Sequence, residues 1–509
     1  MSVARTWGVV LSGLHGDLVE VEADLSNHTP AFIIIGLGDK AVGEAHQRVH
    51  NACGNSGLSL SRRKLTVNLS PANLPKQGSG LDVAIAVAAL ATEHAMDAAS
   101  LAATVHIGEL GLDGRLRPVP GVLPAVAAAA RAGMTRVVVP HANRAEAALV
   151  AGVEVFGAVS LRDVLRRHGL AVEDGDLEPV ALPAVAEPVV PEGLDLADVV
   201  GQSDAVDALI VAAAGGHHLL MSGPPGAGKT MLARRLPGIL PELDDETAIQ
   251  AASLRSLAGM RVGGLSRTAP FEAPHHSASV AALVGGGSRV VRPGAIARAG
   301  GGVLFLDEAA EFGAHALDAL RQPLETGSVE IHRAGFRATF PARFQLVMAT
   351  NPCPCGNYGV PGGECTCPSL AIRRYLGKLS GPLLDRIDIE LSLQRVQVAR
   401  ARVADERQTT RMARERVREA RERAAARLRE TPWRTNAEVS GAWLRDGPLA
   451  PEPVIRRPLD AALQRGALTL RGYDRVLRVA WSVADLAGRE RLEVADIGRA
   501  LYLKKGMRG

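Results

Sequence analysis

The sequence predicts an α/β protein whose central domain holds a doubly wound parallel sheet and whose C-terminal domain is helical. Short apolar runs alternate with helical segments through most of the chain, which is typical of α/β architecture. A glycine-rich segment, residues 223–230, stands between one such run and a helical segment, as in the strand–loop–helix units of parallel sheets. The 509 residues exceed what one hydrophobic core usually serves, so we expect several domains.

The composition is that of a folded protein. Hydrophobic residues make up 47% of the chain and charged residues 22%, proportions that argue against global disorder. No apolar run reaches the ~20 residues that a membrane helix needs, and the first residues lack the pattern of a signal peptide. We therefore expect a cytoplasmic protein without a membrane partner. The net charge of +4 is too small to identify a nucleic-acid partner by itself.

Residues 1–177 predict an N-terminal α/β domain. Short β-rich runs occur at residues 32–36, 65–69, 105–107 and 137–139, and helical patterns at 84–91 and 122–132. A linker is expected at residues 178–193, because repeated prolines disfavour both helix and strand.

Residues 194–395 predict the central domain, and residues 396–509 predict a helical lid. In the central domain we expect helices at 204–214 and 229–236 and buried strands at 218–222, 303–306 and 345–349. From residue 395 to 429 the sequence has no Pro or Gly, which predicts a long charged helix. Its acidic residues alternate with its arginines, so we interpret it as a solvated helix rather than a nucleic-acid surface.

Residues 223–230 match the pattern G-x-x-x-x-G-K-[ST] in full. The motif consists of Gly223, Pro224, Pro225, Gly226, Ala227, Gly228, Lys229 and Thr230. Its glycines let backbone N–H groups approach phosphates at a helix N-terminus, Lys229 can reach the β- and γ-phosphates, and Thr230 can ligate Mg²⁺. The alternative is a glycine-rich turn with a chance lysine. The strand before the motif and the helix after it favour an ATP and Mg²⁺ site.

Three further polar residues end apolar strands. Asp307 and Glu308 follow residues 302–306 directly, and Asn351 follows residues 345–350. The carboxyl ends of parallel strands are where open α/β sheets bind ligands. We expect Asp307 to hold Mg²⁺ through its bound water, Glu308 to act as general base, and Asn351 to orient the attacking water. A solvated acidic turn is the alternative for the two carboxylates.

Several phrases of the sequence resemble the ComM/YifB family of magnesium-chelatase-like AAA+ ATPases. They are Ala273-Pro-His-His276, Arg292-Pro-Gly294, Phe340-Pro-Ala-Arg-Phe344, Asn351-Pro-Cys-Pro-Cys-Gly356 and Leu379-Ser-Gly-Pro-Leu-Leu-Asp-Arg-Ile-Asp388. The resemblance implies a homo-oligomer, a hexamer, that hydrolyses ATP. It also implies a DNA helicase that drives branch migration in recombination or DNA uptake, with single-stranded or branched DNA as partner.

The same resemblance gives two arginines a role at the nucleotide. Arg386 resembles the arginine finger that a neighbouring subunit donates to the γ-phosphate. Arg471 resembles the sensor-2 arginine of the lid, with Arg475 as the second candidate for that role. A surface arginine in an ion pair is the alternative for each.

Residues 327–344 contain two β-rich runs around Ala334-Gly335, and they resemble the hairpin that lines the pore of related motors. We expect Arg333 and Arg337, with His332 beside them, to contact DNA phosphates. A solvated hairpin is the alternative.

The N-terminal domain resembles the Lon protease domain, but its catalytic dyad is incomplete. Residues 108–123 resemble the Lon segment whose last position is the catalytic lysine, and that position is Leu123. Ser79 is shifted by one from the serine position, where Gly80 stands. Without a basic amine the serine cannot be activated. We expect a non-proteolytic domain with a structural, oligomerising or DNA-guiding role.

Four of the five cysteines lie in one loop rich in Gly and Pro. They are Cys353, Cys355, Cys365 and Cys367, enough ligands for a tetrahedral structural Zn²⁺ site. Reduced free thiols are the alternative, and paired C-x-C is less diagnostic than paired C-x-x-C. We expect His275 and His276, far upstream, to serve packing or pore contacts and not to bind metal.

Two other functions would use the same ATPase chemistry. One is a magnesium-chelatase motor subunit, because the ATPase core also resembles that protein. The other is a protein-remodelling chaperone that works through the same pore. The inactive Lon-like domain favours the recombination family over both.

Overall fold

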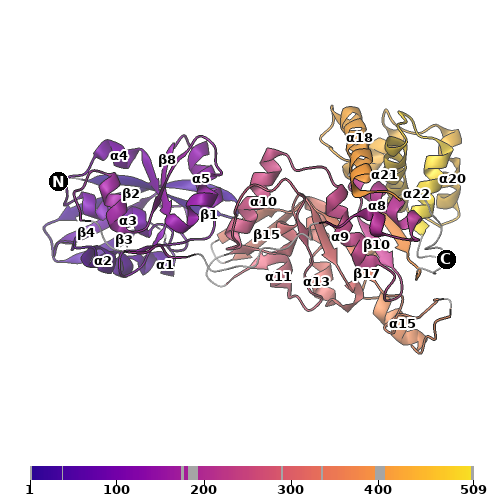
Figure 1. Ribbon diagram of the computed structural model, residues 1–509, viewed down its shortest axis with the longest axis horizontal. Helices are drawn as coiled ribbons and strands as arrows, with labels where there is room; N and C mark the ends of the chain where they lie inside the picture. Colours follow the sequence, from indigo (N-terminus) through magenta and orange to yellow (C-terminus); the bar gives the residue numbers. More distant parts are fainter. Residues whose placement is uncertain are drawn as a thin grey trace.

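The computed structural model describes residues 3–36, 38–173, 177–181, 193–287, 291–333, 336–360, 362–395 and 407–505, without the side chains of residues 333, 336 and 505. Along the longest axis, an N-terminal α/β domain is followed by a domain with a five-stranded sheet, and helices of the C-terminal region cover the far end (Figure 1). The predicted α/β class with a parallel central sheet and a helical C-terminal region is confirmed. Most of the predicted linker, residues 182–192, lies outside the described residues.

A seven-stranded sheet in the order β3-β4-β2-β1-β5-β8-β9 forms the N-terminal domain. Its strands are β1 (Ala4–Ser12), β2 (His15–Ser26), β3 (Ala31–Ile35), β4 (Lys64–Ser70), β5 (Thr104–His106), β8 (Arg136–Pro140) and β9 (Glu154–Ala158). β1 pairs antiparallel with β2 along its whole length, whereas β5, β8 and β9 pair in parallel. The predicted β-rich runs correspond to β3, β4, β5 and β8.

Helices on both sides complete this domain. They are α1 (Lys40–Gly43), α2 (Ala45–Asn55), α3 (Asp82–Ala91), α4 (Ala98–Ala102), α5 (Val122–Arg131), α6 (Arg144–Ala147) and α7 (Leu161–Arg167), with a small ribbon of β6 (Glu109–Leu110) and β7 (Leu116–Arg117). Residues 82–90 of α3 are all buried, which suits a helix made almost entirely of Val, Ala, Ile and Leu. The predicted helices at 84–91 and 122–132 are α3 and α5.

The central sheet has five parallel strands in the order β11-β14-β17-β10-β18. They are β10 (Leu219–Ser222), β11 (Phe271–Glu272), β14 (Val303–Leu306), β17 (Gln345–Thr350) and β18 (Ile389–Ser392). Every residue of β10, β14 and β17 is buried, because parallel strands of a doubly wound sheet are covered on both faces. In the pairing of β10 with β17, Ser222 lies opposite Thr350, so the carboxyl ends of these two strands lie at the same edge of the sheet.

The connections between these strands carry the remaining elements of the central domain. The helices are α8 (Ser203–Gly215), α9 (Lys229–Ile239), α10 (Asp245–Leu257), α11 (Val280–Val284), α12 (Ala295–Arg298), α13 (Ala314–Asp318), α14 (Arg321–Thr326), α15 (Ser369–Leu376) and α16 (Gly381–Leu384). The short strands β12 (Gly285–Gly286) and β13 (Arg292–Pro293) pair with each other, as do β15 (Ser328–Arg333) and β16 (Phe336–Pro341).

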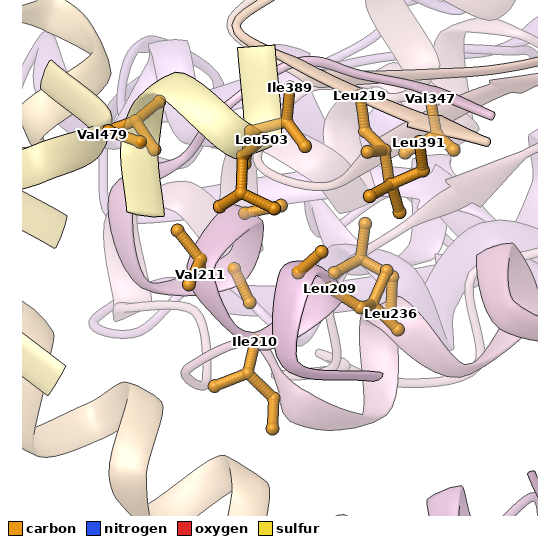
Figure 2. Packing of buried hydrophobic residues seen from close by; sticks show 14 of the residues in the cluster. Leu209, Ile210, Val211, Leu219, Leu236, Val347, Ile389, Leu391, Val479 and Leu503 are labelled. Atoms are coloured by element: carbon orange, nitrogen blue, oxygen red, sulfur yellow. The ribbon is translucent and has the colours of Figure 1, made fainter. Parts of the chain in front are cut away.

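The C-terminal helices share one apolar core with the central domain. They are α18 (Thr410–Leu428), α19 (Gly441–Asp446), α20 (Pro453–Gln464), α21 (Leu470–Leu486) and α22 (Val494–Lys505). In Figure 2, Val479 of α21 and Leu503 of α22 belong to the same cluster as Val211 of α8 and Ile389 of β18. The lid is therefore packed on the sheet domain through buried side chains rather than tethered loosely.

The predicted long charged helix corresponds to α18, and residues 396–406 of the predicted range lie outside the described residues. Arg418 pairs with Glu415 and Glu422 at 2.5 Å each along the exposed face. Ala413, Val417, Ala420, Ala424 and Leu428 form the buried face of the helix. The pairing on the exposed side agrees with the interpretation of a solvated helix.

The first hairpin of the N-terminal domain contacts the β15–β16 hairpin of the central domain. The Ser12 hydroxyl donates to the carbonyl oxygen of Arg337 at 2.8 Å. Gly13 has φ +69°, and a Cβ there would lie 2.5 Å from the Thr339 carbonyl oxygen, so this close approach requires glycine. Beside it, Leu11 and Leu14 pack on an apolar cluster that includes Leu254, Leu257 and Phe340.

Among the described helices, none combines the length and the apolar character that crossing a bilayer requires.

Candidate functional site

The segment from Gly223 to Gly228 joins β10 to the N-terminus of α9. Gly226 and Gly228 have φ +77° and +84°, a left-handed conformation that glycine adopts without strain. The Gly223 N–H donates to the Thr350 carbonyl oxygen at 3.2 Å, which ties the start of the loop to the end of β17. The first backbone N–H groups of a helix have no intrahelical partner, so the N-terminus of α9 is a candidate anion site.

Lys229, the first residue of α9, reaches back over this loop. Its Nζ atom donates to the carbonyl oxygens of Gly223 at 2.5 Å and Pro224 at 3.0 Å, and to Oδ1 of Asn351 at 3.0 Å. Burial lowers the pKa of Lys229, while the carboxylates of Asp307 and Glu308 act in the opposite direction. The structure thus brings the predicted phosphate lysine and the predicted sensor amide into contact.

The two predicted magnesium ligands also meet. The Thr230 hydroxyl donates to Oδ2 of Asp307 at 2.8 Å, and the Glu308 N–H donates to Oδ1 of the same carboxylate at 3.0 Å. A hydroxyl and a carboxylate at this distance, next to an anion-binding loop, are the donor set that Mg²⁺ takes beside ATP phosphates. The residues present therefore fit MgATP.

Glu308 has an unusual backbone and an unexpected partner. Its φ of +52° is the only positive φ of a non-glycine residue among the described residues. Its Oε2 lies 3.2 Å from Nδ1 of His276, which stacks on His275 with ring centroids 4.0 Å apart. The sequence interpretation gave His276 a packing or pore role and missed this contact. No local pattern signals it, because His276 belongs to the connection between β11 and α11.

The two predicted arginines lie together in a separate pocket of about 240 Å³, between the central domain and the lid. The pocket is lined by Leu324, Glu325, Asp385, Arg386, Arg471, Asp474, Arg475 and Arg478. Arg386 is 11% exposed and ion-paired with Glu325, whereas Arg471 is 73% exposed and 4.0 Å from Asp385. Burial, followed by the guanidinium groups of Arg321, Arg471 and Arg475, lowers the pKa of Arg386.

Arg475, the second candidate for the sensor-2 role, is engaged elsewhere. Its Nη1 donates to Oδ1 of Asp388 at 2.5 Å and to the Arg386 carbonyl oxygen at 3.0 Å. Asp388 is buried, and although burial raises its pKa, Arg475 and His217 hold that pKa well below its usual range. Arg475 thus neutralises a buried carboxylate, which argues against the role suggested for it by the sequence.

The predicted hairpin forms, with His332 opposite Arg337 in the β15–β16 register. Arg337 is 61% exposed and its Nη2 donates to Oε1 of Glu330 at 2.7 Å, while His332 lies 3.2 Å from the other oxygen. Arg333 ends β15, and its side chain lies outside the described part of the structure. The turn residues 334 and 335 also lie outside it.

Leu123 and Ser79 lie at or next to the positions of the Lon catalytic lysine and serine, and both make other contacts. Leu123 is completely buried and packs with Ala252 and Val262 of the central domain. The Ser79 hydroxyl donates to the carboxylate of Glu109. The lysine position is thus occupied by an apolar residue at the contact between the N-terminal and central domains.

The four clustered cysteines converge. Their Sγ atoms all lie within 4.8 Å of one another, and all four are free thiols. Cys53, the remaining cysteine, is buried in the N-terminal domain.

Three sequence profiles of one family match successive parts of the chain. Residues 21–143 match the subunit ChlI of Mg-chelatase, residues 195–401 match magnesium chelatase, subunit ChlI, and residues 407–504 match the C-terminal part of that subunit. The central match covers residues 223–230, Asp307, Glu308 and the cysteine cluster.

Curated relatives align with almost the whole chain. An uncharacterised protein of Mycobacterium tuberculosis is 48% identical over 513 residues, which cover 99% of each chain. The competence protein ComM of Haemophilus influenzae is 40% identical over 508 residues, 98% of this chain and 97% of that protein. The YifB protein of Salmonella typhimurium is 38% identical over 511 residues, 98% of each chain.

Proposed function

The chain belongs to the ComM/YifB family of magnesium-chelatase-like AAA+ ATPases, and from this premise we propose that it is a hexameric, ATP-driven motor that acts on DNA. One observation carries the proposal. The strand β17 carries Asn351 directly after its carboxyl end and follows the β15–β16 hairpin at its amino end. A movement of Asn351 with nucleotide state would therefore be transmitted along one short strand to the arginines of the hairpin.

In the proposed reaction, MgATP supplies the phosphoryl group that water attacks. The amides of the Gly223–Gly228 loop and the ammonium of Lys229 bind the phosphates, in place of the carbonyl oxygens that Lys229 contacts in this structure. Thr230 and Asp307 hold the metal. Glu308 accepts a proton from the attacking water, and Asn351 orients that water. The cysteine thiols take no part in this phosphate chemistry.

The arginine pocket is the proposed contact with the next subunit of the ring. Arg386 and Arg471 line one pocket, and no residue of the Gly223–Thr230 loop lines it in the described structure. This favours donation of both arginines to a neighbouring subunit's nucleotide over action at their own. To reach a γ-phosphate, Arg386 has to exchange the carboxylate of Glu325 for the phosphate oxygens.

DNA is the proposed track because the hairpin carries cationic residues and is joined to β17, the strand that Asn351 directly follows. Arg337 is exposed, and within the part of the chain that the structure describes its ion-pair partner is Glu330. Phosphates of a DNA strand would replace Glu330 as the partner of Arg337. Arg333 is the last residue of β15 in the same hairpin. The N-terminal domain, which contacts β16 through Ser12, would support the hairpin from outside.

Two alternatives share the ATPase chemistry. A magnesium-chelatase motor subunit is supported by the name of the three matching profiles. A protein-remodelling chaperone would use the same hairpin on a polypeptide. Neither alternative requires the hairpin to bind DNA phosphates. A change of ATP turnover on addition of DNA therefore distinguishes the proposed function from both.

The deciding experiment compares ATP turnover of the full chain without DNA, with single-stranded DNA and with a branched duplex. We expect both DNAs to stimulate turnover and the branched duplex to be resolved, as followed by displacement of a labelled strand. Lys229→Ala is the control for contaminating ATPases. Unchanged turnover, together with no detectable DNA binding by the ATP-bound oligomer at low salt, would reject the DNA motor and leave the two alternatives.

A further inference from the structure

The loop between β17 and α15 carries four thiols in the arrangement of a metal site. Cys353-Pro-Cys355 begins three residues after β17, and Cys365-Thr-Cys367 ends two residues before α15. The Sγ atom of Cys353 lies 3.3 Å from that of Cys355 and 3.7 Å from that of Cys365, and the Sγ atoms of Cys355 and Cys365 are 3.7 Å apart. Tetrahedral zinc with Zn–S bonds of about 2.3 Å requires sulfur separations of about 3.8 Å. The separations of 3.3–3.7 Å among three of the thiols, with all four Sγ atoms within 4.8 Å of one another, are close to those of one zinc ion bound by four cysteines.

The backbone around the thiols is also formed as in a metal-binding turn. The Gly356 N–H donates to the Cys353 carbonyl oxygen at 3.0 Å, which closes a tight turn around Cys355. The Tyr358 N–H donates to the Cys353 Sγ at 3.3 Å. Amide donors of this kind stabilise the negative charge of a metal-bound thiolate. Cys353 is completely buried and the other three are half-buried, so the site is enclosed but reachable from solvent.

Free thiols explain this arrangement less well. The loop from residue 353 to 367 contains Gly356, Gly359, Gly362 and Gly363, and its only large apolar side chains are those of Tyr358 and Val360. A segment with so little to bury has no hydrophobic core of its own to order it. Bound metal supplies that ordering free energy in small cysteine-rich segments.

The cysteine loop touches the candidate nucleotide site on two sides. Cys353 lies two residues after Asn351, whose Oδ1 accepts a hydrogen bond from Lys229 at 3.0 Å. On one side Gly356, with φ +81°, packs so closely on the phosphate-binding loop that a Cβ would lie 2.5 Å from Cδ of Pro225. On the other side α15 packs on the short helix Ala309–Glu311 that follows Glu308, and Lys378 lies 3.8 Å from Glu311.

We propose that Cys353, Cys355, Cys365 and Cys367 bind one structural Zn²⁺, and that this ion fixes the loop that holds Asn351 against the phosphate-binding loop. The metal site rests on the four thiols alone. Its influence on ATP rests in addition on the proposed nucleotide site. Zinc binding releases the thiol protons and involves no change of oxidation state. Loss of zinc frees the loop, so nucleotide binding weakens while Lys229 and Asp307 remain in place.

The first test is metal analysis of the full chain, purified under reducing conditions. We expect ~1 zinc per chain. Cys355→Ser and Cys367→Ser should retain much less, and Cys53→Ser should retain as much as the wild type, because Cys53 lies in the core of the N-terminal domain. Removing zinc from the wild type with a chelator and adding it back, with circular dichroism as a check of folding, makes the test independent of the variants. Absence of zinc, iron in its place, or a disulfide among the four cysteines overturns the site.

The second test separates the metal from its influence on ATP by means of two glycines. Gly356→Ala adds a methyl group against Pro225, whereas Gly359→Ala imposes the same left-handed strain at φ +70° with nothing within 4 Å. We expect both variants to keep zinc, and only Gly356→Ala to weaken binding of a fluorescent ATP analogue. Zinc-depleted wild type should weaken it as well. If the zinc-free protein binds the analogue as tightly as the zinc-loaded protein, the coupling is wrong. DNA stimulation is not part of either readout, so failure here leaves the proposed motor function untouched.

Discussion

Nδ1 of His276 lies 3.2 Å from Oε2 of Glu308, which joins the connection between β11 and α11 to the predicted general base. A carboxylate that is paired with an imidazole must leave it before it can accept a proton from water. We therefore expect His276→Ala to raise ATP turnover in the absence of DNA and to reduce the ratio of DNA-stimulated to basal turnover. Steady-state phosphate release measures both quantities.

His275→Ala is the matched control for this prediction. The ring of His275 lies against that of His276, but its Nδ1 is 2.8 Å from the Ser277 hydroxyl, whereas Glu308 pairs with His276. A lower basal turnover in His276→Ala, or equal behaviour of the two variants, would show that the contact does not restrain Glu308.

Two substitutions separate phosphate binding from the chemical step. Lys229→Ala should abolish binding of ATP, because it removes the ammonium that binds the phosphates in the proposed reaction. Glu308→Gln should bind ATP normally and turn it over about 10²–10⁴-fold more slowly, the usual contribution of a general base. Binding of a fluorescent ATP analogue and phosphate release are the two measurements. With ATP, Glu308→Gln should also accumulate as a larger oligomer in sedimentation; equal loss of ATP binding in both variants contradicts these roles.

The sequence predicted the buried strands of the central sheet most accurately. Runs at 303–306 and 345–349 became β14 and β17 almost to the residue, because parallel strands buried on both faces are continuous apolar segments. The longest strands, β1 and β2, were not predicted. β2 contains the alternation Val19-Glu-Val-Glu-Ala23, with Val19, Val21 and Ala23 buried, a local pattern of a half-buried strand that the prediction missed. In β1, Val9 and Val10 are both buried, so its burial does not alternate, and its place in the sheet depends on pairing with β2 and β5.

Contacts between residues distant in the sequence could be predicted only in part. The Lys229–Asn351 and Thr230–Asp307 contacts follow from placing motifs at the ends of neighbouring parallel strands. The His276–Glu308 contact follows from the path of an irregular connection, which no periodicity encodes. The same holds for Arg475 of α21, whose partner Asp388 is distant in the sequence and lies directly before β18.

Replacement of Arg475 should destabilise the lid. Asp388 is 2% exposed and pairs with Arg475 at 2.5 Å, so Arg475→Met leaves a buried carboxylate without its cation. Removing one partner of such a pair costs about 3–5 kcal/mol of unfolding free energy. Arg499→Met is the control: Arg499 pairs at 3.1 Å with Asp204, which is 69% exposed, and its loss should cost under about 1 kcal/mol. Urea unfolding followed by tryptophan fluorescence compares them, and similar midpoints for the two variants would contradict the prediction.

Glu146 should make stability depend on pH near neutrality. It lines a cavity of about 330 Å³ between the N-terminal and central domains, and Asn143 donates to its carboxylate at 2.8 Å. Burial raises the pKa of Glu146 to about 7 from an ordinary value of 4.5, although the hydrogen bond from Asn143 opposes the rise. The folded protein therefore binds this proton more tightly than the unfolded chain. The associated stability is fully present below pH 4.5 and is lost as the pH rises through 7.

Glu146→Gln tests this sign. We expect the variant to be more stable than the wild type at pH 8, by up to about 3 kcal/mol, and the difference to vanish towards pH 4.5. Urea unfolding across this range gives the comparison. Glu154→Gln, whose side chain is 56% exposed, should show no such trend between pH 6 and 8. A stability difference that grows as the pH falls would mean that Glu146 is ionised in the folded protein.

The DNA contact of the hairpin is tested by salt dependence. Arg337 is 61% exposed and paired with Glu330, so a DNA phosphate has to displace that carboxylate before it gains a counterion-releasing contact. Arg337→Ala should lower DNA affinity at all sequences and reduce the slope of log affinity against log salt by about one unit. Arg333→Ala should do the same if both arginines contact the strand.

Glu330→Gln should act in the opposite direction, because it frees Arg337 from its partner while keeping the shape of the side chain. We expect tighter DNA binding with an unchanged salt slope, since the number of phosphate contacts stays the same. Arg429→Ala, which removes a 79% exposed arginine from the end of α18, is the control for a general loss of positive charge. Basal ATP turnover should stay near wild type in all four variants, because none of these residues is assigned to the nucleotide site. If Arg429→Ala lowers the salt slope as much as Arg337→Ala does, DNA binds through diffuse charge, and the hairpin is not the contact that couples the track to ATP.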